Sequence, residues 1–322
     1  MWVEILCGVV IYQLLRRYFA GDEEFPDVDS SHSDVAFAVA ARLEKIYGGK
    51  SFVGLRIPDH DSGSRCHIDV VLVTKRELMV VAVRNFAGFV EVDKDGNWVC
   101  TTDKKHRPET HPNPVREVGK QVEILRSYLE QRGVPLPEGH IIGRVVLPNP
   151  NCRPSYSITF QPEAISFDKW RELKPDSSIG ISSWIKDAFK GSKSEQDGFN
   201  QKLEFILSTS PMWDRLELKG DRNILGEFME FKGNQDDVQA LRNLKRSKVS
   251  QFIIQKPSML GFGRSRLQIL YSSRDYRSEG SLASEWKEVA VKPHTEVLFQ
   301  PLHSKKARKF KLSSVVSMTL SA

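Results

Sequence analysis

The sequence is poor in cysteine and lacks the common short catalytic motifs. Its 322 residues contain four cysteines, with no CxxC pair for zinc and no dense disulfide framework, which fits a reducing compartment best. The eight histidines form no HExxH or HxxxH pair, so the sequence gives no support to a zinc hydrolase. No GxSxG motif is present, and Gly261–Arg264 lacks the Lys-Ser/Thr of a phosphate loop, so we expect it to be a turn or exposed loop.

An apolar run of full transmembrane length is also missing. Trp2–Leu15 is apolar over about 14 residues, whereas a spanning helix needs roughly 20. Three alternatives remain: a signal-anchor held by Arg16 and Arg17, an amphipathic helix on a membrane surface, or a helix packed on the protein. We expect residues 1–20 to attach the protein to a membrane, facing the cytoplasm, with residues 21–32 as an acidic tether.

Charge is concentrated in the last third of the chain. Pro211–Ala322 contains 20 Lys and Arg against 12 Asp and Glu, an excess of eight, while the whole chain carries +6. A basic surface suits nucleic acid or an anionic membrane, although a solvated lysine-rich surface is the alternative. The densest run is Ser304–Lys311, which is either a contact surface or a solvated hairpin. Its candidate contact residues are Lys305, Lys306, Arg308, Lys309 and Lys311.

Helical and strand patterns alternate in the first half of the chain. Apolar residues from Val35 to Ile46 recur at helical spacing behind Ser33, the expected N-cap, and Gly48-Gly49 ends this helix. Asn113-Pro114 is expected to begin a second helix that runs to about Gln131. Strands are expected at Ser51–Ile57, Cys66–Thr74, Leu78–Arg84, Phe89–Val92, Trp98–Thr101 and His140–Leu147, with a hairpin turn at Asp95–Asn97.

The second half changes from helices to strands. Helices at Ser182–Phe189 and Asn200–Leu207 are expected on either side of a linker, Lys190–Gly198. A short helix at Gln235–Leu244 is expected to have Asn234 as its N-cap. Strands are expected at Ile224–Phe231, Val249–Gln255, Leu267–Tyr271, Trp286–Val291, Glu296–Phe299 and Phe310–Leu320, with Trp213, Trp286 and Phe299 in the core.

These patterns predict an α/β protein with a second, smaller unit. We expect an α/β domain with a mixed sheet flanked by helices over residues 33–175. A helical connector at 176–210 and a basic, mostly β domain at 211–322 follow it.

Several segments resemble the NERD (nuclease-related domain) family. Ile68–Val73 resembles the family's I-D-x-V-V-V strand, and Val80–Gly88 is similar to its V-I-E-x-K-N-aromatic-small-G segment. Asp95–Trp98 matches a turn followed by Trp, and Asn113-Pro114 matches the N-P-x-x-Q helix start. The resemblance covers about Ser33–Leu147 and implies a restriction-endonuclease-like fold of the PD-(D/E)xK type.

The resemblance implies a site that the chain keeps only in part. In that family an Asp and a Glu hold Mg²⁺ through oxygens, and a Lys two residues after the Glu assists the reaction. Here Asp69 is present, but Ala82 stands for the Glu and Arg84 for the Lys. Arg84 keeps the charge and can grip phosphate, but it cannot act as a base. Glu117 stands for the helix Gln.

Two interpretations follow from this damaged motif. In the first, the site is inactive, no cofactor is needed, and the protein binds or scaffolds a partner, which is a nucleic acid, an anionic membrane or another protein. In the second, the protein is a Mg²⁺-dependent nuclease whose second carboxylate comes from Glu117, with Asp69 as the other ligand, aided by Asp34 or Glu123. A third hypothesis is nucleic-acid binding through the basic C-terminal domain alone.

Overall fold

The computed structural model describes residues 31–75, 77–102, 108–137, 139–173, 193–244, 247–255, 266–273 and 286–321. Within these ranges no helix is both long and apolar enough to cross a bilayer. The apolar run Trp2–Leu15 and the expected helix Ser182–Phe189 lie outside the described residues. Membrane attachment therefore stays a prediction.

A five-stranded mixed sheet forms the centre of the first unit. Its order is β1-β2-β3-β7-β9, antiparallel from β1 to β3 and parallel from β3 to β9. The middle strands bury almost every residue, because helices cover both faces. The strands span Lys50–Pro58 (β1), Arg65–Val73 (β2), Leu78–Val83 (β3), Ile141–Val146 (β7) and Ala164–Ile165 (β9).

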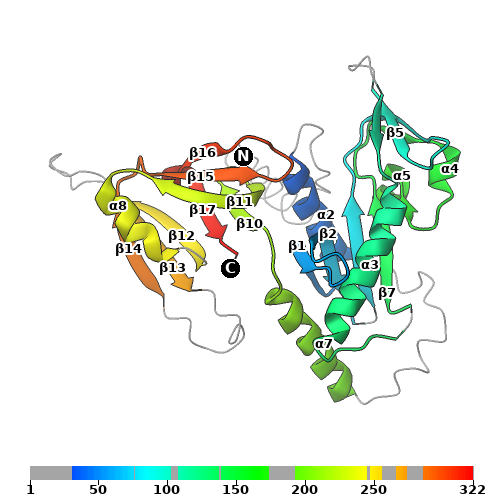
Figure 1. The fold of residues 1–322 in the computed structure, drawn as a ribbon, viewed down its shortest axis with the longest axis horizontal. Coiled ribbons are helices and arrows are strands. Elements are labelled where there is room, and N and C mark those ends of the chain that lie inside the picture. Colours follow the sequence, from blue (N-terminus) through cyan, green and yellow to red (C-terminus); the bar gives the residue numbers. More distant parts are fainter. Residues whose placement is uncertain are drawn as a thin grey trace, which may run out of the picture.

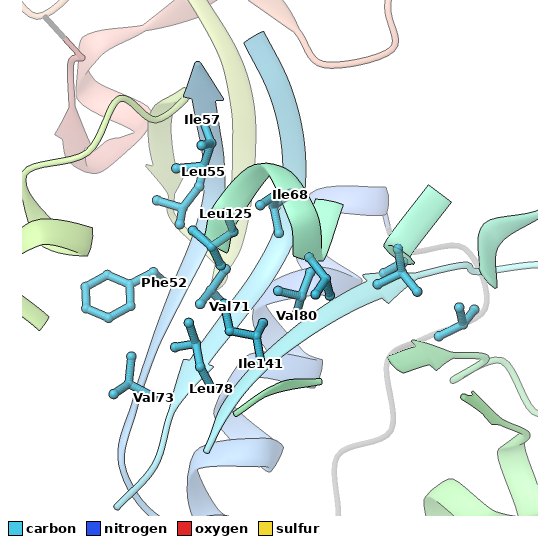
Figure 2. Packing of buried hydrophobic residues seen from close by; sticks show 14 of the residues in the cluster. Phe52, Leu55, Ile57, Ile68, Val71, Val73, Leu78, Val80, Leu125 and Ile141 are labelled. Carbon is cyan, nitrogen blue, oxygen red and sulfur yellow. The ribbon is translucent and has the colours of Figure 1, made fainter. Parts of the chain in front are cut away.

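Two helices sandwich this sheet. Helix α2 (His32–Tyr47) packs Val35 and Val39 on one face, while α3 (Pro114–Glu130) covers the other face. Figure 2 shows Leu125 of α3 among Ile68, Val71 and Val80 of β2 and β3. The helix N-cap predicted at Asn113 is confirmed, since its side chain accepts from Val115 N–H.

The predicted N-cap of the first helix is wrong. Ser31, not Ser33, has the extended backbone of a cap, and its side chain accepts from Asp34 N–H. Ser33 lies inside the helix, where its Oγ accepts a hydrogen bond from Leu225 N–H in the second unit. The helix thus begins two residues before the position suggested by its apolar spacing.

A smaller four-stranded sheet extends the first unit, in the order β6-β5-β4-β8. The predicted hairpin turn at Asp95–Asn97 is confirmed, because Asp93 N–H donates to Asn97 O. Trp98 of this hairpin is fully buried. These strands span Gly88–Val92 (β4), Trp98–Thr101 (β5), Glu109–His111 (β6) and Cys152–Pro154 (β8); short helices follow at Tyr156–Thr159 (α4) and Phe167–Glu172 (α5).

The linker predicted at Lys190–Gly198 is wrong over residues 193–198, which belong to helix α7 (Lys193–Ser208). Further along this helix, Leu203, Ile206 and Leu207 join the core of the first unit. The helix that connects the two units therefore packs on the α/β domain.

The C-terminal unit is an eight-stranded sheet in the order β14-β13-β12-β17-β10-β11-β15-β16. The predicted N-cap Asn234 of α8 (Gln235–Ala240) is confirmed, and a 3₁₀ turn, η1 (Leu241–Leu244), follows. The strands span Asp214–Leu218 (β10), Arg222–Lys232 (β11), Ser247–Gln255 (β12), Arg266–Ser273 (β13), Lys287–Val291 (β14), Glu296–Pro301 (β15), Arg308–Lys311 (β16) and Val315–Thr319 (β17).

Three sequence expectations for this unit need correction. The single strand expected at Phe310–Leu320 is two strands separated by a 3₁₀ turn, η2 (Leu312–Ser314). Trp286 is 45% exposed rather than core, and Trp213 lies at the junction of the two units. Phe299 is fully buried, as predicted. The predicted α/β class, with a mixed sheet flanked by helices and a mostly β C-terminal region, is confirmed.

The two units meet along α2 and β1. Figure 1 shows β11 and β15 beside α2, and β11 contacts this helix. Asn223 N–H donates to the Asp34 carboxylate at 2.5 Å, and Trp213 N–H donates to Gly54 O at 2.9 Å. These bonds satisfy backbone groups of the second unit with acceptors from the first.

Candidate functional site

A buried carboxylate lies where β2 and β3 separate. The registered pairs between these antiparallel strands end at Val70 opposite Val81. Beyond that pair, a side chain takes the place of a backbone acceptor from β2. The Oδ2 atom of Asp69 accepts a hydrogen bond from Val83 N–H at 2.8 Å. Asp69 is only 3% exposed. A buried charge of this kind persists only when donors surround it.

Two imidazoles and one guanidinium supply the remaining donors to Asp69. His32 Nε2 and His67 Nε2 lie 3.1 and 2.9 Å from its Oδ1. Arg84 Nη1 donates to Asp69 Oδ2 at 3.0 Å. Asp69 therefore joins the start of α2, strand β2 and the end of β3 through one side chain.

The partners of His67 determine where its proton lies. Trp213 Nε1 donates to His67 Nδ1 at 3.0 Å, and an indole N–H can only donate. Nδ1 is therefore unprotonated, and the proton on Nε2 is the one shared with the Asp69 carboxylate. His67 is thus a neutral ring with both nitrogens engaged, and its position depends on residues from both units.

Trp213 is itself held in place. The Arg56 guanidinium lies 3.9 Å from the centroid of the indole and pairs with Glu227 at 3.1 Å. Trp213 also lines a cavity of about 440 Å³ between α2, β1 and the C-terminal sheet. The residues that contact Asp69 do not line that cavity, so the polar cluster is a separate feature.

Arg84 connects Asp69 to helix α3. Its Nη2 donates to Glu117 Oε2 at 2.8 Å, while its Nη1 also donates to Val83 O. The guanidinium therefore bridges the two carboxylates that the sequence suggested as metal ligands. The structure brings Asp69, Arg84 and Glu117 together, but the group that lies between the two acids is the Arg84 guanidinium and not a metal ion.

The environment of Asp69 fixes its charge. Burial alone raises the pKa of this carboxyl group, but the hydrogen bonds that it accepts from His32 and His67 hold the pKa well below its ordinary value. Asp69 is therefore ionised at neutral pH. Nearby, burial raises the pKa of the Cys66 thiol to about 11, so this cysteine is a weak nucleophile.

A third histidine reaches the cluster from the C-terminal unit. His303, in the loop between β15 and β16, has a left-handed backbone with φ of 65°. Its ring lies 5.2 Å from that of His32 and 6.4 Å from that of His67. One ring nitrogen from each of the three histidines lies within 4.8 Å of the other two.

The residues present do not fit the two-acid Mg²⁺ site implied by the resemblance. Ala82, two residues before Arg84, is fully buried in the apolar core on the side of α3 and offers no ligand. The oxygens of Asp69 accept from four groups, and Glu117 is paired with Arg84. Mg²⁺ needs several free oxygen ligands, which this arrangement does not provide.

The remaining predicted site residues lie elsewhere. Asp34 accepts from Ser31 Oγ and Asn223 N–H, so it supports the junction rather than Asp69. Glu123 pairs with Arg126 along α3. The basic residues Lys305, Lys306, Arg308, Lys309 and Lys311 are exposed on the β15–β16 hairpin, immediately after His303.

Sequence reasoning missed four members of the cluster: His32, His67, His303 and Trp213. His67 stands two residues before Asp69 in a strand, a spacing that places both side chains on one face of a regular strand. That signal was available. The other three come from distant segments, and no local spacing connects them to β2.

The stretch from α2 to the end of β7 matches a known family. Residues 32–148 match the NERD family model, the nuclease-related domain. The match includes His32, His67, Asp69, Arg84 and Glu117, whereas Trp213 and His303 lie beyond it. No significant match was found among curated proteins or solved structures.

Asp69 should be a major stabilising residue of the stretch that matches the family model. We expect Asp69→Ala to lower the free energy of unfolding by about 3–5 kcal/mol, because it leaves the buried Val83 N–H without an acceptor and the half-buried Arg84 without one of its two carboxylates. Urea denaturation in the presence of EDTA measures this change in the free energy of unfolding. Asp95→Ala, an exposed change in the β4–β5 turn, is the control and should cost under ~0.5 kcal/mol. Equal stability of the two variants would contradict the role of Asp69.

Proposed function

We propose that the nuclease-related domain is a non-catalytic binding module. The observation that carries this proposal is the pairing of Asp69 with four donors, at a site where Ala82 replaces the second acid. A Mg²⁺ ion shared by Asp69 and Glu117 would have to take the position of the Arg84 guanidinium, which donates to both carboxylates. Like charges at such short range oppose the approach of the ion.

Arg84 supports the same proposal. A general base must release its proton near neutral pH, and an arginine side chain does not. Its planar donors instead bind Asp69 and Glu117 on two sides. The residues kept from the nuclease motif thus stabilise the fold and its surface rather than a reacting phosphate.

A nuclease assay tests this function. We expect the full-length protein to show no Mg²⁺- or Mn²⁺-dependent cleavage of single- or double-stranded DNA or RNA above the level of Asp69→Ala. The physical reason is the missing carboxylate at Ala82. Cleavage by the wild type that Asp69→Ala abolishes would contradict the proposal.

A variant with restored ligands controls for substrate choice. Ala82→Glu combined with Arg84→Lys re-creates the acid and lysine of the family motif. Circular dichroism must first show that the double variant folds, since Ala82 is buried. Metal-dependent cleavage by the folded double variant on a substrate that the wild type leaves intact would show that the assay detects this type of site.

The basic hairpin favours a nucleic acid as the bound partner. Its five cationic residues are exposed and follow His303, beside the polar cluster. Lys309 is near Glu296 at 3.9 Å, a weak surface pair that leaves its charge accessible. A row of cations on one hairpin suits a phosphate backbone.

The salt dependence of binding measures this contact. We expect replacement of Lys305, Lys306 and Arg308 by Gln to reduce the slope of log affinity against log salt by about 2–3, because each phosphate contact contributes about 0.7–0.9. Fluorescence anisotropy with a labelled oligonucleotide gives the slope. Gln at the exposed Lys45, Lys94 and Lys120 is the matched control. An unchanged slope in the hairpin variant would exclude this surface.

We also propose that residues 1–20 attach the module to a membrane. The support is the apolar run Trp2–Leu15 followed by Arg16 and Arg17. We expect the full-length protein to sediment with membranes and a chain lacking residues 1–20 to remain in the supernatant. Equal distribution of the two forms after fractionation would contradict attachment.

A further inference from the structure

We propose that His32, His67, His303 and Asp69 bind one divalent transition-metal ion of the Zn²⁺ type at the junction of the two units. The proposal goes beyond the binding function above and concerns a different ligand set from the Mg²⁺ site of two acids. Three imidazoles and one carboxylate suit Zn²⁺ or Co²⁺, whereas Mg²⁺ prefers oxygen.

The distances around Asp69 are close to those of a metal centre. With metal–ligand bonds of about 2.0–2.1 Å, neighbouring ligands of a tetrahedral ion lie about 3.3 Å apart. His32 Nε2 and His67 Nε2 lie 3.1 and 2.9 Å from Asp69 Oδ1. An ion could therefore replace the two protons that these rings share with the carboxylate.

His303 supplies the fourth ligand from the second unit. The three histidine nitrogens lie within 4.8 Å of one another, so each of their separations is within about 1.5 Å of tetrahedral spacing. His303 is exposed, while His32 and His67 are 28% and 25% exposed, which leaves a path for the ion.

Trp213 should oppose this ion. For Nε2 of neutral His67 to bind a metal, the ring proton must move to Nδ1, where the indole N–H already donates. Metal-bound histidines normally donate from the second nitrogen to an acceptor. Removal of the indole N–H should therefore tighten binding, an effect that a purely structural histidine cluster would not give.

Zinc binding by the full-length, tag-free protein tests the site. In competition with a chromophoric chelator, we expect one Zn²⁺ per chain, and a loss of affinity of at least about 10-fold in His32→Gln and in His303→Asn. Gln can still donate to Asp69, and Asn tolerates the left-handed backbone of His303, so both variants should fold. Co²⁺ should give the visible absorption bands of a tetrahedral ion.

The controls separate this site from unspecific binding. His294→Asn, an exposed histidine in the turn between β14 and β15, should leave the affinity unchanged. Trp213→Phe should raise it roughly 10-fold. Absence of stoichiometric Zn²⁺ binding, equal losses in His294→Asn and His303→Asn, or no gain in Trp213→Phe would each overturn the four-ligand site. None of these results depends on nuclease activity or oligonucleotide binding.

Discussion

The site depends on one buried charge, the carboxylate of Asp69. Because β2 and β3 stop pairing at Val70 and Val81, the backbone at Val83 needs a new acceptor, and Asp69 provides it. An ionised carboxylate at 3% exposure must be compensated on every side, which explains the convergence of His32, His67 and Arg84. The constraint on a single side chain thus organises α2, β2, β3 and, through Arg84, α3.

The same constraint explains how the sheet keeps its fold where its residues depart from the motif that the resemblance suggests. The apolar positions of β2 and β3 are still buried on both faces, so the sheet has the same reason to form. Ala82 fills the core on the side of α3, where an unpaired Glu would cost several kcal/mol. Arg84 then supplies a positive charge between Asp69 and Glu117.

Sequence patterns predicted those parts of the fold whose signals are local. The long apolar strand at Ile68–Val73 and the cap at Asn113 leave clear traces, and strand position was enough to place Asp69 near Arg84. Strands of two or three residues, such as Cys152–Pro154, leave no period to detect. His303 and Trp213 could not be assigned to the site, because their positions depend on how an eight-stranded sheet packs against α2.

The position of the cluster gives the C-terminal unit a direct influence on the first unit. His67 receives its hydrogen bond from Trp213, and His303 lies against His32, so both units determine the protonation and spacing of the imidazoles. The backbone contacts at Asp34 and Gly54 hold the units in this arrangement. A ligand that binds all three histidines would therefore contact both units at once, because these side chains come from α2, β2 and the β15–β16 loop. Trp213 and His303, which lie outside the family match, therefore belong to the same polar cluster as the matched residues His32, His67 and Asp69.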